Sequence, residues 1–159
     1  MFTERERRFL ERAIELSRKG MMDGLGGPFG CVIVKGDEIV GEGSNQVTFS
    51  NDPTAHAEVV AIREACKKLN TYQLTGCEIY TSCEPCPMCL GAIYWARPVR
   101  VIYANTKQDA AAIEFDDDFI YQEINTVMTD RKIPFLHFPH PLAKEVFEQW
   151  KSLENKKLY

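Results

Sequence analysis

Three potential metal ligands and one carboxylate stand in two short motifs of this sequence. His56 and Glu58 are separated by one residue, and Cys86 and Cys89 are separated by two. Zinc is bound by imidazole nitrogen and thiolate sulfur, and a catalytic zinc site keeps three protein ligands and one open position. Glu58 suits a proton carrier beside the metal better than a ligand, because residues two apart on a helix point away from each other. The pattern predicts hydrolytic chemistry at zinc, with His56, Cys86 and Cys89 as ligands.

Two predicted helices position these motifs. The turn residues 51–54 predict a helix from Ala55 to about Leu69, with the His-x-Glu motif in its first turn. The two cysteines would share one face at the start of a second helix, from Cys86 to Ala96, because residues three apart are neighbours on a helix. Two helix N-termini would then converge on one ion, and their positive dipole ends favour thiolates.

Cys83 leaves a second interpretation open. It lies three residues before Cys86 and could complete a closed zinc site of one histidine and three cysteines. Structural zinc sites of this kind have four protein ligands, and the protein would then be a zinc-binding module rather than an enzyme. Two features weigh against it, since Cys83 follows a predicted strand and Glu58 would have no function in a closed site.

The remaining pattern predicts an α/β fold in one domain spanning residues 1–159. A capping box at Thr3 and Glu6 begins a helix that we expect to end at Gly20. Strands alternate with helices, which is typical of a sheet covered on both faces. A last helix, from Pro141 to about Leu153, carries an apolar stripe suited to a core or a subunit interface. Strands are predicted at 29–35, 38–44, 78–82, 99–104 and 133–138, and a short helix at 119–124.

Composition limits the partners. The 159 residues are 45% hydrophobic, enough for a buried core, and the net charge of -4 disfavours nucleic acid, which binds basic surfaces. No run of eighteen apolar residues predicts a membrane span, so we expect no membrane association. Six cysteines without a recognisable signal peptide favour reduced thiols in a cytoplasmic protein.

These motifs resemble those of the cytidine and deoxycytidylate deaminase superfamily, whose zinc signature is H-x-E followed by P-C-x-x-C. Within it the chain is similar to the bacterial guanine deaminases over essentially its whole length, including the Asn-Lys-Lys ending and terminal Tyr. The resemblance implies a three-layer α/β/α fold around a five-stranded mixed sheet. It also implies conversion of guanine to xanthine with one zinc ion per subunit. The segments that carry it are 26–30, 51–58, 81–89 and 115–117.

The resemblance also implies roles for single residues. Glu58 would be the proton shuttle, and Asn45 would contact the substrate ring, since a side-chain amide offers both a donor and an acceptor. Asp117 would read the amidine edge of guanine, because an ionised carboxylate only accepts and that edge offers two N–H donors. Phe29 and Trp95 would supply apolar walls for the base.

A homodimer with an exchanged C-terminal segment, from about residue 110 to 159, is a further implication of the resemblance. Such an exchange would bring Asp117 and Tyr159 into the partner's active site, and the sequence leaves open whether they act in their own subunit or in the other. It also leaves open whether the substrate is guanine, guanosine or another aminated base. Single-stranded nucleic acid or tRNA is a weaker alternative, because it requires a basic surface.

Overall fold

A central strand with apolar side chains on both faces organises the sheet of this structure, a computed structural model that describes residues 2–159. β1 (Gly30–Lys35) pairs antiparallel with β2 (Glu38–Ser44) and with β3 (Cys77–Cys83), and β3 pairs in parallel with β4 (Arg100–Asn105). The order β2-β1-β3-β4 makes a mixed sheet of four strands. The register of β1 against β2, which pairs Lys35 with Glu38, makes a hairpin that turns at Gly36–Asp37.

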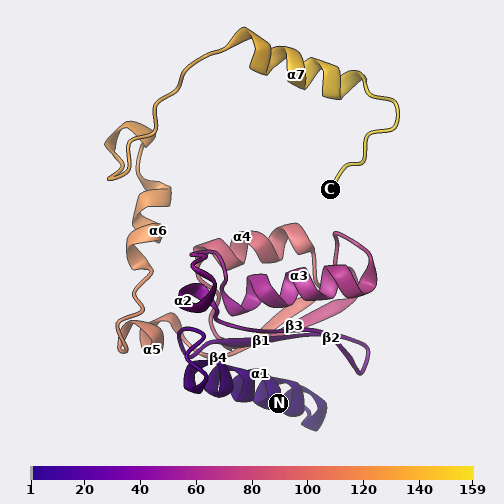
Figure 1. Cartoon of the computed structure of the whole chain (residues 1–159), viewed down its shortest axis with the longest axis vertical. Helices are drawn as coiled ribbons and strands as arrows, with labels where there is room; N and C mark the ends of the chain where they lie inside the picture. Colours follow the sequence, from indigo (N-terminus) through magenta and orange to yellow (C-terminus); the bar gives the residue numbers. More distant parts are fainter. Residues whose placement is uncertain (1) are drawn as a thin grey trace. The chain divides into compact units, whose positions relative to one another are not determined.

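Helices cover both faces of this sheet. Figure 1 shows α1 (Glu4–Met22) on one face, and α3 (Ala57–Leu69) and α4 (Pro87–Ala96) on the other. This arrangement confirms the predicted three-layer α/β/α fold. Two short helices, α2 (Val47–Ser50) and α5 (Lys107–Ala111), lie in the connections. No helix among residues 2–159 is long and apolar enough to cross a membrane.

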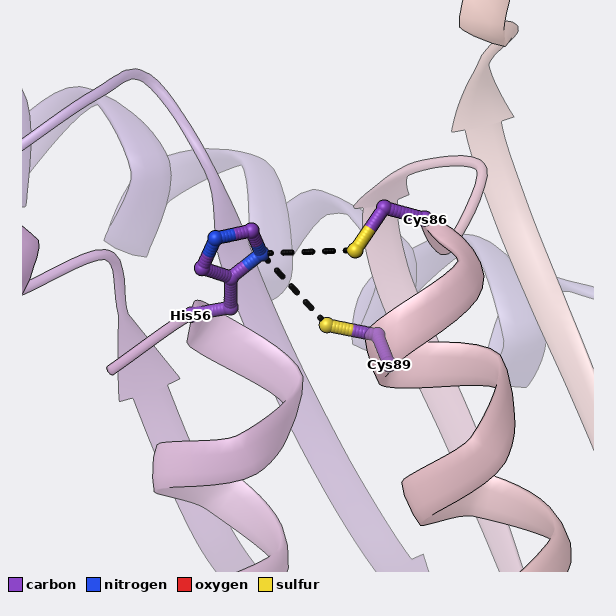
Figure 2. Close-up of side chains that lie close together, drawn as sticks. All are labelled: His56, Cys86 and Cys89. Carbon is purple, nitrogen blue, oxygen red and sulfur yellow. Dashed lines mark hydrogen bonds between the residues drawn. The ribbon is translucent and has the colours of Figure 1, made fainter. Parts of the chain in front are cut away.

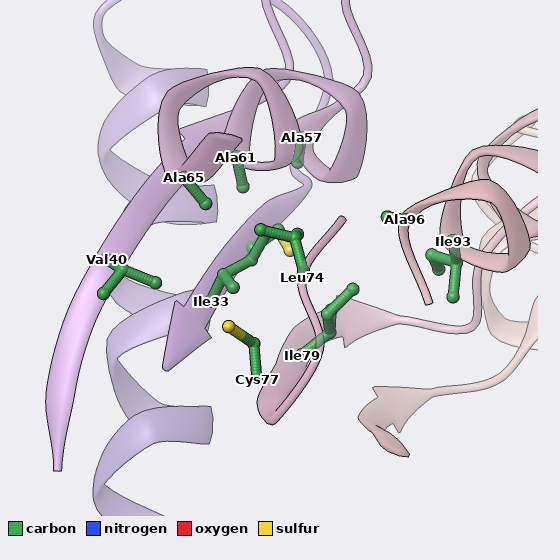
Figure 3. Packing of buried hydrophobic residues seen from close by; sticks show 11 residues of the cluster. Ile33, Val40, Ala57, Ala61, Ala65, Leu74, Cys77, Ile79, Ile93 and Ala96 are labelled. Carbon is green, nitrogen blue, oxygen red and sulfur yellow. The ribbon is translucent and has the colours of Figure 1, made fainter. Parts of the chain in front are cut away.

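The core consists of two clusters, one on each face of the sheet. Successive side chains of a strand point to opposite faces. Cys31 and Ile33 of β1 therefore join the cluster beneath α3 and α4, which Figure 3 shows, whereas Val32 and Val34 join the cluster against α1. Burial on both faces explains why β1 reads as a continuous apolar run without alternation.

α3 lies close to β2 because both elements carry small residues where they meet. Ala57, Ala61 and Ala65 follow one another at intervals of one turn and are fully buried. A Cβ added at Gly41 would lie 2.5 Å from the carbonyl oxygen of Ala61, and one at Gly43 would lie 2.3 Å from that of Ala57. This contact between backbones fixes the height of α3, and of the motif at its N-terminus, above the sheet.

α1 begins as predicted but ends later. The capping box between Thr3 and Glu6 is confirmed, whereas the predicted stop at Gly20 is wrong, since α1 continues to Met22. A Cβ at Gly20 would lie 2.6 Å from the Cβ of Ser44. Glycine at this position therefore permits close packing of α1 against β2 and does not terminate the helix.

The chain divides into two units, the first ending at Asp117 and the second spanning Asp118–Tyr159. The second unit contains α6 (Asp118–Asn125), a 3₁₀ turn at Met128–Asp130 and α7 (Pro141–Ser152). The fifth strand predicted at 133–138 is wrong for the described residues, because this exposed segment forms no strand and the sheet has four. Two prolines in and beside the segment lack the N–H that a sheet ladder requires.

Candidate active site

Two helix N-termini meet at the predicted metal ligands. His56 is the N-cap of α3 and Cys86 is the N-cap of α4, both with extended backbones, and Pro87 occupies the first position of α4. The helices thus begin one or two residues later than the sequence predicted. The positive dipole ends of both helices therefore lie at the group formed by His56, Cys86 and Cys89, where they favour thiolate ligands.

The three predicted ligand atoms lie at distances that fit one zinc ion. Nδ1 of His56 is 3.5 Å from Sγ of Cys86 and 3.6 Å from Sγ of Cys89 (Figure 2). Nitrogen and sulfur bound tetrahedrally to zinc, at about 2.0 and 2.3 Å from the metal, would be about 3.5 Å apart. All three atoms lie within 4.8 Å of one another, and among residues 2–159 this is the one group placed to hold a metal.

The two thiols of this group share one proton. A hydrogen bond from Cys89, together with the His56 ring, outweighs burial and lowers the pKa of Cys86 to about 4. The bond to Cys86 and burial instead raise the pKa of Cys89. Zinc binds thiolates, so the site already supplies one thiolate and the metal displaces the proton of the other.

Glu58 lies buried beside the metal group. Its side chain belongs to the first turn of α3, and the residue is 6% exposed. Oε2 is 3.3 Å from Sγ of Cys89, and Oε1 accepts a hydrogen bond of 3.2 Å from the hydroxyl of Thr81. Burial raises the pKa of the Glu58 carboxyl. A carboxyl group whose pKa is raised in this way holds a proton more readily than an exposed one, which suits a group that accepts and returns a proton.

The sequence prediction missed Thr81, which holds Glu58 in place. Thr81 stands on β3 and is 1% exposed, with its hydroxyl between Glu58 and the carbonyl oxygen of Gly30. The neighbouring Ser82 accepts a hydrogen bond of 2.9 Å from the Gly30 N–H. Two adjacent hydroxyl residues at the end of a strand, directly before the cysteine motif, were the available signal.

Cys83 does not complete a closed zinc site in this structure. Its sulfur lies 3.6 Å from the carbonyl oxygen of Thr106, and the residue is buried. Burial raises the pKa of Cys83 to about 11, which keeps it a thiol at neutral pH. The described residues therefore give the metal group three candidate ligands, the number found in catalytic zinc sites.

Asn45 is held so that its amide offers a donor only. Its Oδ1 accepts hydrogen bonds from the backbone N–H groups of Gly27 at 3.3 Å and Val47 at 3.2 Å. These two donors occupy both lone pairs of the oxygen and fix the orientation of the amide. The Nδ2 group is left for a ligand. A Cβ at Gly26 would lie 2.1 Å from Oδ1, so glycine is required beside this amide.

Asp117 belongs to the first unit and lies near the metal ligands of its own chain. Burial raises the pKa of Asp117, and the negative charge of Cys86 raises it further. The pKa of His56, raised chiefly by its bond to Cys86, is raised also by the charge of Asp117. Phe29, partly buried against the core, packs edge-on against the ring of Phe115, with ring centroids 4.9 Å apart.

Trp95 and Tyr159 are not brought to this group within the first unit. Trp95 is 62% exposed near the C-terminal end of α4, nine residues after Cys86 and about 13 Å farther along the helix axis. Tyr159 belongs to the second unit and is 69% exposed. The roles of both in binding a substrate stay predictions.

Comparisons with known proteins agree with this geometry. Residues 3–105 match the family model for the cytidine and deoxycytidylate deaminase zinc-binding region. The guanine deaminase of Bacillus subtilis (strain 168) is 57% identical over 151 residues, which cover 95% of this chain and 97% of that protein. An X-ray structure of guanine deaminase from Bacillus subtilis matches with a TM-score of 0.95 and 54% identity, covering 99% of each chain. The tRNA-specific adenosine deaminase of Aquifex aeolicus is 35% identical over 80% of this chain and 83% of its own.

Proposed function

Because the chain belongs to the cytidine and deoxycytidylate deaminase family, we propose that it is a zinc-dependent aminohydrolase that converts guanine and water to xanthine and ammonia. The observation that carries this conclusion is the similarity to the Bacillus subtilis guanine deaminase over nearly the full length of both chains. The three-ligand group beside a buried carboxylate supports it independently of that similarity.

His56, Cys86 and Cys89 would hold the zinc ion. When bound, zinc supplies a Lewis acid that lowers the pKa of a coordinated water from 15.7 to about 7. The protein contributes two helix N-termini that stabilise thiolates and an arrangement that uses three side chains only, which leaves a position for water.

Glu58 moves the protons of the reaction. It accepts a proton from the attacking water and donates it to the ring nitrogen next to the carbon that bears the amine. It then takes the remaining proton from the new hydroxyl group on that carbon and passes it to the departing amine. The new bond joins oxygen to that carbon, and the bond that breaks releases ammonia. The hydroxyl of Thr81 keeps one carboxylate oxygen fixed, so that the other faces Cys89 and the metal group.

Asn45 and Asp117 would select guanine by complementary hydrogen bonding. The amide of Asn45 offers only N–H, so it requires an acceptor on the purine ring. The carboxylate of Asp117 only accepts, so it requires the N–H groups of the guanine amidine edge. Adenine presents a lone pair at the corresponding ring nitrogen, which a carboxylate repels. Phe29 would provide an apolar wall for the base.

We also propose a homodimer in which the second unit is exchanged between subunits. Neither α6 nor α7 has a buried residue, and α4 exposes three large apolar side chains, Leu90, Tyr94 and Trp95. Exposed apolar surface of this extent is typical of an interface. Tyr159 would then act in the partner's site, while Asp117 acts in its own.

Six free thiols are consistent with a reducing compartment, the cytoplasm.

Complementation tests the exchange. If Tyr159 acts in the partner's site, a mixed dimer of Glu58→Gln and Tyr159→Ala chains contains one site with both residues intact, and mixing the two weakened variants restores activity. If Tyr159 acts within its own subunit, mixing restores nothing. A monomer in a solution mass measurement would also contradict the exchange.

A substrate panel tests the function. Zinc-loaded protein is assayed for ammonia release from guanine, guanosine, adenine, cytosine and cytidine, and for deamination of an adenosine-containing RNA stem-loop, the substrate class named for the Aquifex aeolicus relative. We expect turnover of guanine alone. Stronger turnover of guanosine would establish the runner-up, a nucleoside deaminase. Inactivity towards guanine at full zinc content would contradict the proposal.

A further inference from the structure

The segment that carries Asp117 is tied to the metal-ligand loop where it begins. Glu84, two residues before Cys86, donates its backbone N–H to the carbonyl oxygen of Asn105 at 2.8 Å. Its carboxylate accepts the backbone N–H of Lys107, the first residue of α5, at 3.1 Å. The start of α5 therefore moves with the loop that holds Cys86.

α5 ends in a tight turn that reverses the chain. Glu114 has a φ of 70°, a left-handed conformation that is uncommon for a residue with a side chain. Its N–H bonds to the carbonyl oxygen of Ala111 at 3.0 Å, and the N–H of Phe115 bonds to that of Ala110 at 3.1 Å. These two bonds form the Schellman motif that ends many helices. The turn directs the chain from Phe115 onwards away from the axis of α5.

Phe115 anchors the end of this turn to the loop before β1. Its ring meets the ring of Phe29 at an interplanar angle of 89°, the edge-to-face arrangement that aromatic pairs favour. A Cβ added at Gly27 would lie 2.8 Å from Cζ of Phe115 and 3.1 Å from Cε2 of Phe29. The two rings thus fill the space that a side chain at Gly27 would occupy. The same loop carries the Gly27 N–H that orients Asn45.

We propose that Phe115 is a positioning residue for Asp117, because its contact with Phe29 and Gly27 fixes the carboxylate, two residues later, beside the metal group. Only Asp116 separates Asp117 from this anchor, so the place of the Phe115 ring limits where the Asp117 carboxylate can lie. The anchor also joins the two loops that select the base, since Gly27 and Asn45 are bonded to each other.

Phe115 is 46% exposed, so its contribution to global stability is small compared with its effect on the local chain. Loss of activity in a Phe115 variant would therefore reflect the local chain and not unfolding of the core. The positioning role of Phe115 rests on the proposed function only where Asp117 is assigned the recognition of guanine. The alternative, in which the Phe115 ring contacts the base directly and independently of Asp117, makes a different prediction.

A double-mutant cycle distinguishes these roles. We expect Asp117→Ala to lower kcat/KM for guanine about a hundredfold, and Phe115→Ala to lower it about tenfold, chiefly through KM, at unchanged zinc content. If Phe115 acts through Asp117, the double variant stays within about twofold of Asp117→Ala, because coupled effects do not add. Phe115→Leu should recover most of the loss. Multiplying effects, or no effect of Phe115→Ala, would overturn the proposal. Phe2→Ala, which truncates an aromatic residue that is 69% exposed at the N-terminus, is the control.

Hydrogen exchange tests the positioning without any substrate. In Phe115→Ala, the amides of residues 114 and 115 should exchange at least tenfold faster, while those of α3 and β3 stay protected. Unchanged protection at 114 and 115 would overturn the proposal. If the wild-type protein failed to deaminate guanine, the proposed function would fail, yet this exchange measurement would still decide whether Phe115 holds the segment.

Discussion

Replacing Gly43 by alanine tests how closely the sheet and the catalytic helix must approach. The added Cβ would lie 2.3 Å from the carbonyl oxygen of Ala57 and 2.8 Å from the backbone nitrogen of Ala61. Nonbonded heavy atoms prefer separations of about 3.5 Å, so α3 must move by about 1 Å. Both contacted atoms belong to the backbone, and no side-chain rotation can relieve the overlap.

The structure sets the size of the effect. Overpacking a core costs about 1–3 kcal/mol, and the rigid contact at Gly43 places this substitution near the upper value. For a chain of this length, a loss of about 3 kcal/mol lowers the melting temperature by about 6–12 °C. Because His56 and Glu58 stand at the N-terminus of α3, a shift of 1 Å should also lower kcat for guanine about a hundredfold.

Thermal unfolding and guanine turnover are measured on Gly43→Ala and on a matched control, Gly91→Ala. A Cβ at Gly91 meets no atom within 4 Å, and the position lies inside α4. Alanine should stabilise that helix by about 0.5–1 kcal/mol, so the melting temperature of this control should not fall. If Gly43→Ala melted and turned over guanine like the wild-type protein, the account of how α3 is positioned would be refuted.

Three further substitutions probe the site and the sheet. Asn45→Asp keeps an acceptor for both backbone N–H groups but removes the N–H donor to the base. We therefore expect KM for guanine to rise about a hundredfold with zinc retained. An unchanged KM would exclude the donor role. Thr81→Val removes the bond to Glu58 and should lower kcat about tenfold at unchanged KM, and a change in KM alone would argue against it. Burial raises the pKa of the Glu78 carboxyl, but hydrogen bonds from a tyrosine hydroxyl and two guanidinium groups together outweigh burial and lower it. The ionised carboxylate therefore stabilises the folded protein above the unfolded pKa, near 4.5. This stabilisation is lost as the pH falls through the lower pKa of the folded state. Unfolding of zinc-free Glu78→Gln should therefore occur at a lower temperature than wild type at pH 7, with a difference that shrinks below about pH 4.5; a constant difference would contradict this sign.

The sequence predicted that His56, Cys86 and Cys89 would lie together because these residues stand in short motifs. His56 and Cys86 begin helices, and local turn and capping preferences are enough to place them there. Their meeting point follows from the alternation of strands and helices, which fixes where the helices lie on the sheet. The strands of the first unit were predictable for the same reason, since their apolar runs are bounded by glycine and turn residues.

Other features depend on contacts that are distant in sequence. Gly20 resembles a helix stop, but its packing against Ser44 overrides the local signal. The donor-only amide of Asn45 arises from a loop eighteen residues earlier, which no local pattern reveals. The segment at 133–138 has a strand-like composition, yet a strand requires a partner edge, and the described residues give it none. Strand-like composition alone therefore does not make this segment a strand.

Guanine turnover by the zinc-loaded protein, compared with Glu58→Gln, tests the central claim most directly. Glutamine preserves the size of the side chain and the bond from Thr81 but cannot carry the proton. We expect one zinc ion per chain in both proteins, conversion of guanine to xanthine by the wild type, and a loss of at least about a hundredfold in kcat for Glu58→Gln. Undiminished turnover in that variant, or a wild-type protein that binds zinc and leaves guanine intact, would contradict the account.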